Sequence, residues 1–180
     1  MNRRDALKSL LVLSGSAAVY GSDRFLTGAI NPPELAVETR FTPELLALAE
    51  EIAETIIPAT TDSGGAKDAK LGIFMQEIVS LYYSSEEQAL FFAGLDRVQA
   101  DGAAQFQQNF VDLADVERTA ILMGYETGEI PAGYRAIKQL TTWGYFSSEV
   151  GMTEARAFLP IPTRYEGDLP LKPGQKAWAY

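Results

Sequence analysis

The sequence predicts an all-α fold, a small helical bundle of about five helices with an irregular, Pro-rich C-terminal tail. Three observations predict this. Apolar residues recur at helical spacing along most of the chain, capping residues and Pro or Gly mark where these stretches end, and no stretch alternates like a half-buried strand. The 180 residues, 47% apolar and 22% charged, have the composition of an ordinary globular domain.

The first two helices are expected between residues 42 and 83. Thr42 has the form of an N-cap, Pro43 suits the first helical position, and Pro58 ends the helix. Its inward face comprises Leu45, Leu48, Ala49, Ile52, Ala53 and Ile56. After a loop, a second helix runs from about Asp68 to Tyr83. Its inward face comprises Leu71, Phe74, Met75, Ile78 and Tyr82.

Three more helices follow. Ser85 with Gln88 has the form of a capping box and starts a third helix, which carries Phe91, Leu95 and Val98. Asp112 is expected to cap a fourth, whose inner face would be Leu113, Val116, Ala120 and Met123. A break from Gly128 to Gly133 precedes a fifth, which holds Tyr134, Ile137, Thr141, Gly144 and Tyr145. A short helical turn beyond Gly151 leads into the tail.

The chain opens with an apparent export signal. Arg3 and Arg4 are followed by Leu7, Lys8 and a mildly apolar run far shorter than the roughly 20 residues that span a bilayer. This order resembles a twin-arginine signal, although Ala6 stands where phenylalanine is common. We expect residues 1–30 to form the signal segment and linker, and residues 31–180 one helical domain with its tail from about residue 159. The alternative is an ordinary N-terminal amphipathic helix.

Composition makes several classes of function improbable. The sequence contains no Cys and no His, which removes disulfides, Cys- or His-ligated metals, CxxCH haem attachment and imidazole bases. A net charge of -9 opposes nucleic acid as a partner. Glu50, Glu51 and Glu54 lack the Glu-x-x-His pattern of a di-iron bundle, so we expect a solvated face there. Residues 62–65 favour a plain turn.

Two segments are candidate contact surfaces. The stretch "TTWGYFSSEVG" contains Trp143, Tyr145, Phe146 and Glu149, and it is either helix packing around Gly144 or an aromatic surface for a partner. The tail carries Tyr165 and Trp178 among four prolines, and it could wrap its own bundle or lie across a partner. No catalytic, cofactor-binding or metal-binding residue is assigned.

Several stretches together resemble a known family. They are "NRRDALKSLL", "AETIIPATTDSGGAKDAK", "FFAGLDRVQADGAAQF", "LTTWGYFSSEVGMTEA" and "IPTRYEGDLPLKPGQKAWA". Taken in order, they resemble the small subunit (subunit 3, or gamma subunit) of gluconate 2-dehydrogenase and related flavin-dependent sugar dehydrogenases.

This resemblance implies a non-catalytic accessory subunit in a bacterial complex. A large flavoprotein of the glucose–methanol–choline (GMC) type would hold FAD and oxidise the sugar or aldonate, and a multihaem cytochrome c subunit could carry electrons onward through haem c. The small subunit would bind no cofactor itself. It would escort the folded large subunit through the twin-arginine translocase to the periplasm or the periplasmic face of the inner membrane.

Two other functions remain open at this point. One is an independent exported helical binding or structural protein with no dehydrogenase partner. The other is a small enzyme that works with carboxylates alone.

Overall fold

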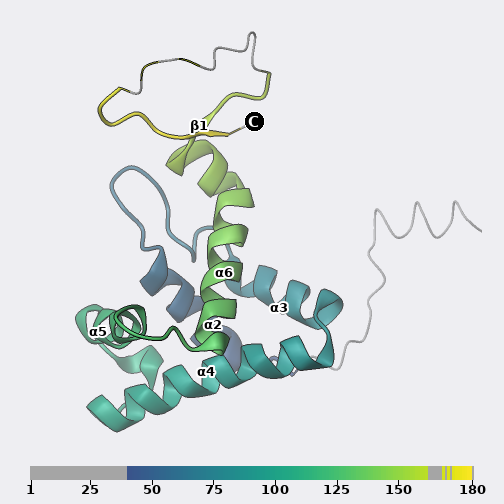
Figure 1. Cartoon of the computed structure of the whole chain (residues 1–180), viewed down its shortest axis with the longest axis vertical. Helices are drawn as coiled ribbons and strands as arrows, with labels where there is room; N and C mark the ends of the chain where they lie inside the picture. The colour runs from purple at the N-terminus through teal and green to yellow at the C-terminus, as the bar shows by residue number, and fades with distance from the viewer. Residues whose placement is uncertain (1–39, 162–167, 169, 171, 180) are drawn as a thin grey trace, which may run out of the picture. The chain divides into compact units, whose positions relative to one another are not determined.

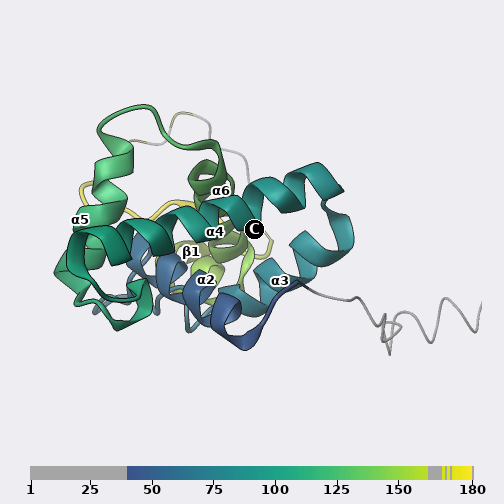
Figure 2. The ribbon, with the colours of Figure 1, turned by 90° about the horizontal axis from the view of Figure 1, so that it is seen from below.

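The computed structural model describes residues 40–161, 168, 170 and 172–179, which belong to one compact unit, Thr39–Tyr180. Helix α6 (Ala132–Ser147) runs through the middle of this unit (Figure 1). Helix α4 (Ser85–Phe106) crosses one end of α6, and a short β ribbon lies at the other end. Helices α3 (Leu71–Tyr82) and α5 (Asp115–Glu126) lie on opposite sides of α6, and α2 (Pro43–Ile56) lies between them in contact with all three helices (Figure 2). The predicted all-α class is confirmed.

Helix α2 begins and ends as its sequence predicts. The Thr42 hydroxyl accepts a hydrogen bond from the backbone N–H of Leu45 at 3.3 Å, and Pro43 occupies the first turn, where its missing N–H costs nothing. Of the predicted inward residues, four are buried and the other two, Leu45 and Ile56, pack against the core while partly exposed. The four are Leu48, Ala49, Ile52 and Ala53.

Helices α3 and α4 differ from the predictions in two details. Tyr82 is 74% exposed, because Leu71, Met75 and Val79 form the buried face and Val79 takes the last inward place. The capping box of α4 lies one residue earlier than predicted. The backbone N–H of Ser84 donates to the Glu87 carboxylate at 2.8 Å, and the backbone N–H of Glu87 donates to the Ser84 hydroxyl. The predicted core residues of α4 are buried as expected; they are Phe91, Leu95 and Val98.

The prediction for the fourth helix is wrong in its start and in its face. Asp112 ends a short 3₁₀ turn (Phe110–Asp112), where its carboxylate accepts a bond from the Asn109 side chain. Helix α5 starts only at Asp115. The core receives Ile121, Leu122 and Tyr125, whereas Val116 and Met123 are 75% and 55% exposed and Ala120 also faces solvent. Leu113 is buried ahead of the helix.

Close packing of α4 on α6 depends on two glycines. A Cβ added to Gly94 would lie 2.5 Å from the carbonyl carbon of Gly133, and one added to Gly133 would lie 2.6 Å from Gly94 Cα. The two backbones therefore touch at this crossing. All five residues that the sequence places on the inner face of α6 are buried; they are Tyr134, Ile137, Thr141, Gly144 and Tyr145.

The C-terminal segment folds back on the end of the bundle. A π-helical turn (Gly151–Ala155) leads into strand β1 (Ala157–Phe158), which pairs in parallel with β2 (Trp178–Ala179). The N–H groups of Ala157 and Leu159 donate to the carbonyls of Ala177 and Ala179 at 2.8 and 2.7 Å. The sequence analysis predicts no strand, because two residues per strand are too few to show alternation. Ala179 is buried, so this part of the tail packs on its own domain.

Candidate protein-interaction site

Helix α6 presents aromatic side chains on the side opposite its buried face. Tyr145 and Gly144 point inward, so Trp143 and Phe146, three residues apart, both point outward, with 57% and 40% of their surface exposed. Both belong to the contact stretch selected from the sequence. The helix therefore orients two large apolar side chains toward solvent at one level of the bundle.

A third aromatic residue comes from α3. A Cβ at Gly144 would lie 2.6 Å from the Phe74 ring, so Phe74 rests against the backbone of α6. Its ring meets Trp143 edge to face with centroids 5.4 Å apart. We call Phe74, Trp143 and Phe146 the aromatic face. Sequence periodicity assigns Phe74 to the core, and only the crossing of α3 and α6 brings it beside Trp143.

Arg156 supports the same face from beyond the end of α6. Its guanidinium lies 5.5 Å from the Phe146 ring centroid and donates a hydrogen bond to the Phe146 carbonyl. Such a contact holds the ring in place without covering it. The aromatic face is thus preorganised, which lowers the entropy lost when a partner binds.

The remaining predicted contact residues have different positions. Tyr145 is buried, and its hydroxyl donates to the Gly64 carbonyl at 2.6 Å, so this side chain holds the 59–70 loop instead of facing a partner. Glu149 and Trp178 are exposed, Trp178 by 51%. Tyr165 and the export residues Arg3, Arg4, Leu7 and Lys8 lie outside the described residues.

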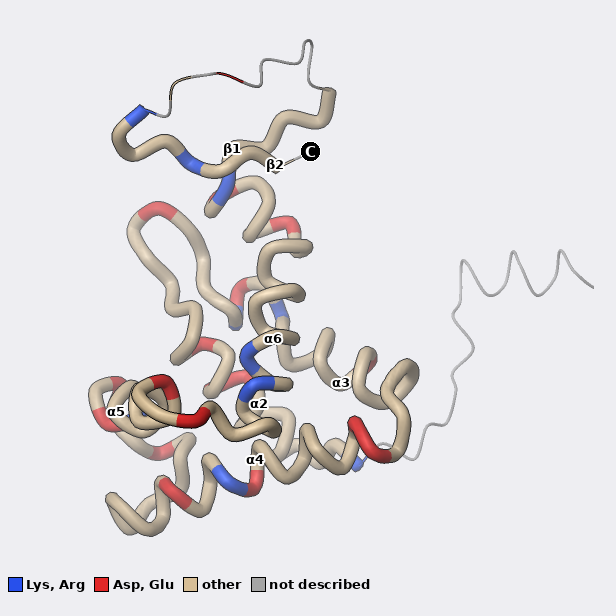
Figure 3. Tube along the Cα trace, viewed as in Figure 1, with Lys and Arg blue, Asp and Glu red and all other residues tan. Residues whose placement is uncertain are grey.

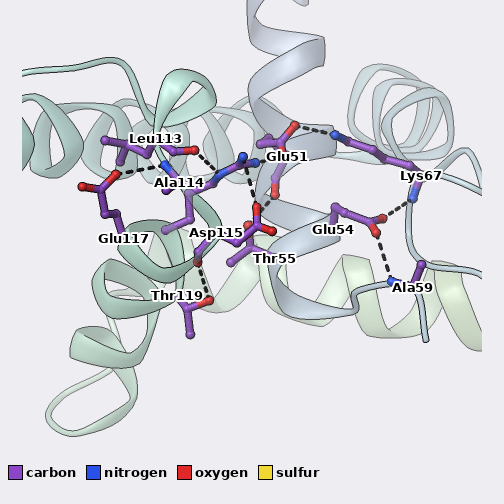
Figure 4. Close-up of polar contacts among 11 residues, drawn as sticks. Glu51, Glu54, Thr55, Ala59, Lys67, Leu113, Ala114, Asp115, Glu117 and Thr119 are labelled. Carbon is purple, nitrogen blue, oxygen red and sulfur yellow. Dashed lines mark hydrogen bonds and ion pairs between the residues drawn. The ribbon is translucent and has the colours of Figure 1, made fainter. Parts of the chain in front are cut away.

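A polar network between α2 and α5 was not predicted. The Glu51 carboxylate, expected on a solvated face, is only 13% exposed and pairs with Arg118 and, at 2.5 Å, with Lys67 (Figure 4). Arg118 also donates to the Leu113 carbonyl at 2.9 Å and lies 3.3 Å from Asp115. Burial lowers the pKa of the Arg118 guanidinium, but the group stays cationic at neutral pH.

Glu54 fastens the following loop in the same region. One oxygen of its carboxylate accepts the N–H of Ala59 at 3.1 Å, and the other accepts the N–H of Lys67 at 2.8 Å (Figure 4). Together with Glu51, it ties α2, α5 and the 59–70 loop together. Residue spacing along α2 cannot reveal such partners, since Arg118 and Lys67 are distant in sequence.

Within residues 40–161 and the described part of the tail, no group of three or more Asp or Glu side chains is arranged to hold a metal ion. In the same residues, no helix has the length and hydropathy needed to cross a membrane.

The comparison with known protein families identifies the chain's relatives. Residues 43–163 match the family described as gluconate 2-dehydrogenase subunit 3. The match begins with the first residue of α2, extends past β1 and includes the whole aromatic face. The chain belongs to this family. Its relatives are accordingly subunits of a dehydrogenase complex, as the resemblance predicts. No curated protein and no solved structure matches the chain.

Proposed function

We propose that this chain is a non-catalytic accessory subunit of an FAD-dependent sugar or aldonate dehydrogenase. In this proposal it binds the folded large flavoprotein in the cytoplasm, carries it through the twin-arginine translocase and remains bound as a stabilising component in the periplasm or at the periplasmic face of the inner membrane. FAD belongs to the large subunit, and haem c to a third subunit where one is present. Membership of a dehydrogenase-subunit family supports the partner class.

The aromatic face is the observation that carries the proposal. Trp, Tyr and Phe anchor protein interfaces because they bury a large area at small entropic cost. A stable interface buries more than about 1,000 Å² in total, or roughly 500 Å² on each partner. Two half-exposed aromatic rings supply only part of that area. The interface therefore extends to neighbouring exposed residues, of which Glu149 and Trp178 are candidates.

A first experiment tests binding. The chain is co-produced with the large flavoprotein subunit of its complex. Trp143→Ala with Phe146→Ala is compared with Val116→Ala, which truncates an exposed apolar residue on α5, outside the aromatic face. We expect the double variant to bind the flavoprotein at least about 30-fold more weakly, as loss of an interface anchor does, and Val116→Ala to bind normally. Equal binding by all three proteins would reject the aromatic face as the docking site.

A second experiment tests escort. Arg3→Lys with Arg4→Lys keeps the positive charge but removes the paired guanidinium groups. We expect the flavoprotein to accumulate in the cytoplasm with its FAD bound. Normal periplasmic activity in this strain would overturn the escort role, and purification of the chain without any flavin absorbance would favour an independent binding protein.

A further inference from the structure

A groove runs between α2 and α5. It consists of two adjoining hollows that share Thr55 and Thr119 as walls. The larger, of about 370 Å³, is lined by Glu51, Glu54, Asp115 and Arg118. The smaller, of about 190 Å³, is lined by Ile56, Leu122, Met123 and Tyr134 and by the ion pair of Glu126 with Lys138. We call the two hollows together the α2–α5 groove.

The larger hollow has a negative charge. Three carboxylates and one guanidinium line it. Arg118 pairs with Glu51 and Asp115, and Lys67 pairs with Glu51 from the adjoining loop, which leaves one net negative charge. The Asp115 side chain is 99% exposed and lies at the rim (Figure 4). Acidic residues also gather along α5 in Figure 3. A ligand that enters this end of the groove therefore gains by carrying a positive charge.

The smaller hollow adjoins an uncovered apolar face. Val116, Ala120 and Met123 lie along the outward side of α5, while Ile121, Leu122 and Tyr125 are buried on its inward side. An exposed row of apolar side chains of this kind on a helix is a candidate contact surface for a partner. The hollow has room for about one apolar side chain of the size of Leu or Met, which could enter beside Met123.

We propose that the α2–α5 groove binds a helical segment of a second partner protein, with Lys or Arg in the acidic hollow and a neighbouring Leu or Met in the apolar one. Charge decides against a second copy of this chain, because its net charge is -9 and the rim of the groove is acidic. The groove lies between α2 and α5, whereas the aromatic face is formed by residues of α3 and α6, and the two surfaces share no residue. The proposal thus goes beyond binding of the flavoprotein and gives the subunit a second docking surface.

Methionine methyl NMR on the full chain tests this directly. The probe is a synthetic amphipathic helix of alternating Leu and Lys clusters, compared with one in which Glu replaces every Lys. We expect the Lys peptide to shift the Met123 methyl signal in a saturable manner, while Met75, which is fully buried, and Met152, beyond the end of α6, stay in place. An unmoved Met123 signal, or an equal shift with the Glu peptide, would overturn the proposal.

Charge variants distinguish binding in the groove from non-specific attraction of a basic peptide to an acidic protein. We expect Asp115→Lys to weaken binding of the Lys peptide at least tenfold, and Asp115→Asn to weaken it by a smaller factor. Glu129→Lys makes the same charge change at an exposed position outside the groove and should alter binding less than twofold. Equal losses for Asp115→Lys and Glu129→Lys would show non-specific attraction and reject the site. Circular dichroism checks that each variant is folded.

Two further measurements complete the test. The Trp143→Ala, Phe146→Ala variant should bind the Lys peptide normally, so loss of flavoprotein binding leaves this proposal standing. Sedimentation velocity examines the alternative occupant: a dimer of the wild-type chain that Asp115→Lys dissociates would assign the groove to a second copy and overturn the proposal.

Discussion

Glu51 is mostly buried and paired with two cations, although its position in the sequence predicts a solvated side chain. Its place among Glu50 and Glu54 suggests a solvated helix face, yet Arg118 and Lys67 enclose its carboxylate, and all three side chains come from different segments. Burying a carboxylate is costly unless cations and hydrogen bonds compensate it. The network is therefore a point at which a single substitution leaves an uncompensated charge.

We predict that Arg118→Met destabilises the protein more than the double variant Glu51→Gln, Arg118→Met. The single change leaves Glu51 enclosed with Lys67 as its one remaining cation. We expect a loss of about 2–3 kcal/mol, below the 3–5 kcal/mol found for fully buried pairs. The double variant removes the stranded charge and should lose about 1 kcal/mol. Urea unfolding measures both, and additive losses would contradict the pairing.

Asp101 makes the stability of the fold depend on pH in the acid range. Partial burial by itself would raise the pKa of this carboxyl, but hydrogen bonds from Tyr125 at 2.6 Å and Arg97 at 2.8 Å outweigh it and hold the pKa below its ordinary value of 3.8. A carboxyl whose pKa is lower in the folded state than in the unfolded state stabilises the fold at pH values above its unfolded-state pKa. This stabilisation is lost as the pH falls through the folded-state pKa.

We therefore predict that Tyr125→Phe lowers stability at pH 7 by about 1–2 kcal/mol, through loss of one hydrogen bond to a charged group. The difference from the wild type should shrink as the pH is lowered from 4 toward 2, where Asp101 becomes protonated in both proteins. Urea midpoints across this range measure the effect. Tyr82→Phe, on an exposed ring, serves as the control; a difference independent of pH would refute the role of Asp101.

At the scale of elements, the crossing of α4 and α6 determines which glycines can be replaced. Helix propensity alone favours alanine over glycine by about 1 kcal/mol in any helix interior. At Gly94, however, the added methyl group would meet the backbone of Gly133, which has no flexible side chain to move away. At Gly124 on α5, nothing lies within 4 Å of the added Cβ.

The two alanine substitutions should consequently have opposite signs. We predict that Gly94→Ala destabilises by about 2 kcal/mol or more, because overpacking exceeds the gain in helix propensity. Gly124→Ala should stabilise by about 0.5–1 kcal/mol. Thermal and urea unfolding of the pair measure the difference. Stabilisation by both changes would mean that the two helices do not touch at Gly133.

At the scale of the whole molecule, the central position of α6 separates two surfaces. The aromatic face is formed by residues of α3 and α6, whereas the groove is bordered by α5, which lies on the side of α6 opposite to α3 (Figure 2). The two surfaces share no residue, so ligands at the two sites should bind independently.

This separation predicts a ternary complex. When the chain is saturated with the Lys peptide, its affinity for the flavoprotein should stay within about twofold of the original value, and both should sediment as one species. The Glu peptide is the control for non-specific effects. Displacement of the flavoprotein by the Lys peptide would mean that one surface binds both.

The sequence by itself determined the fold class, the order of the helices, the cap of α2, the inward faces of α2 and α6, and the family resemblance. These follow from local rules, because helical spacing and capping depend on residues a few positions apart. It also selected Trp143 and Phe146 as contact residues, though not the position of Phe74 beside them.

Only the tertiary structure decided the rest. Helix α5 has two apolar sets at helical spacing, and periodicity cannot tell which set faces the core. In the structure Ile121, Leu122 and Tyr125 are buried, Arg118 pairs with Glu51 of α2, and Val116 and Met123 face outward. The burial of Tyr145 and the pairing of β1 with β2 likewise depend on partners far away in sequence. Spacing along a chain determines which residues share a face, whereas the direction of that face is set by contacts between segments that only folding brings together.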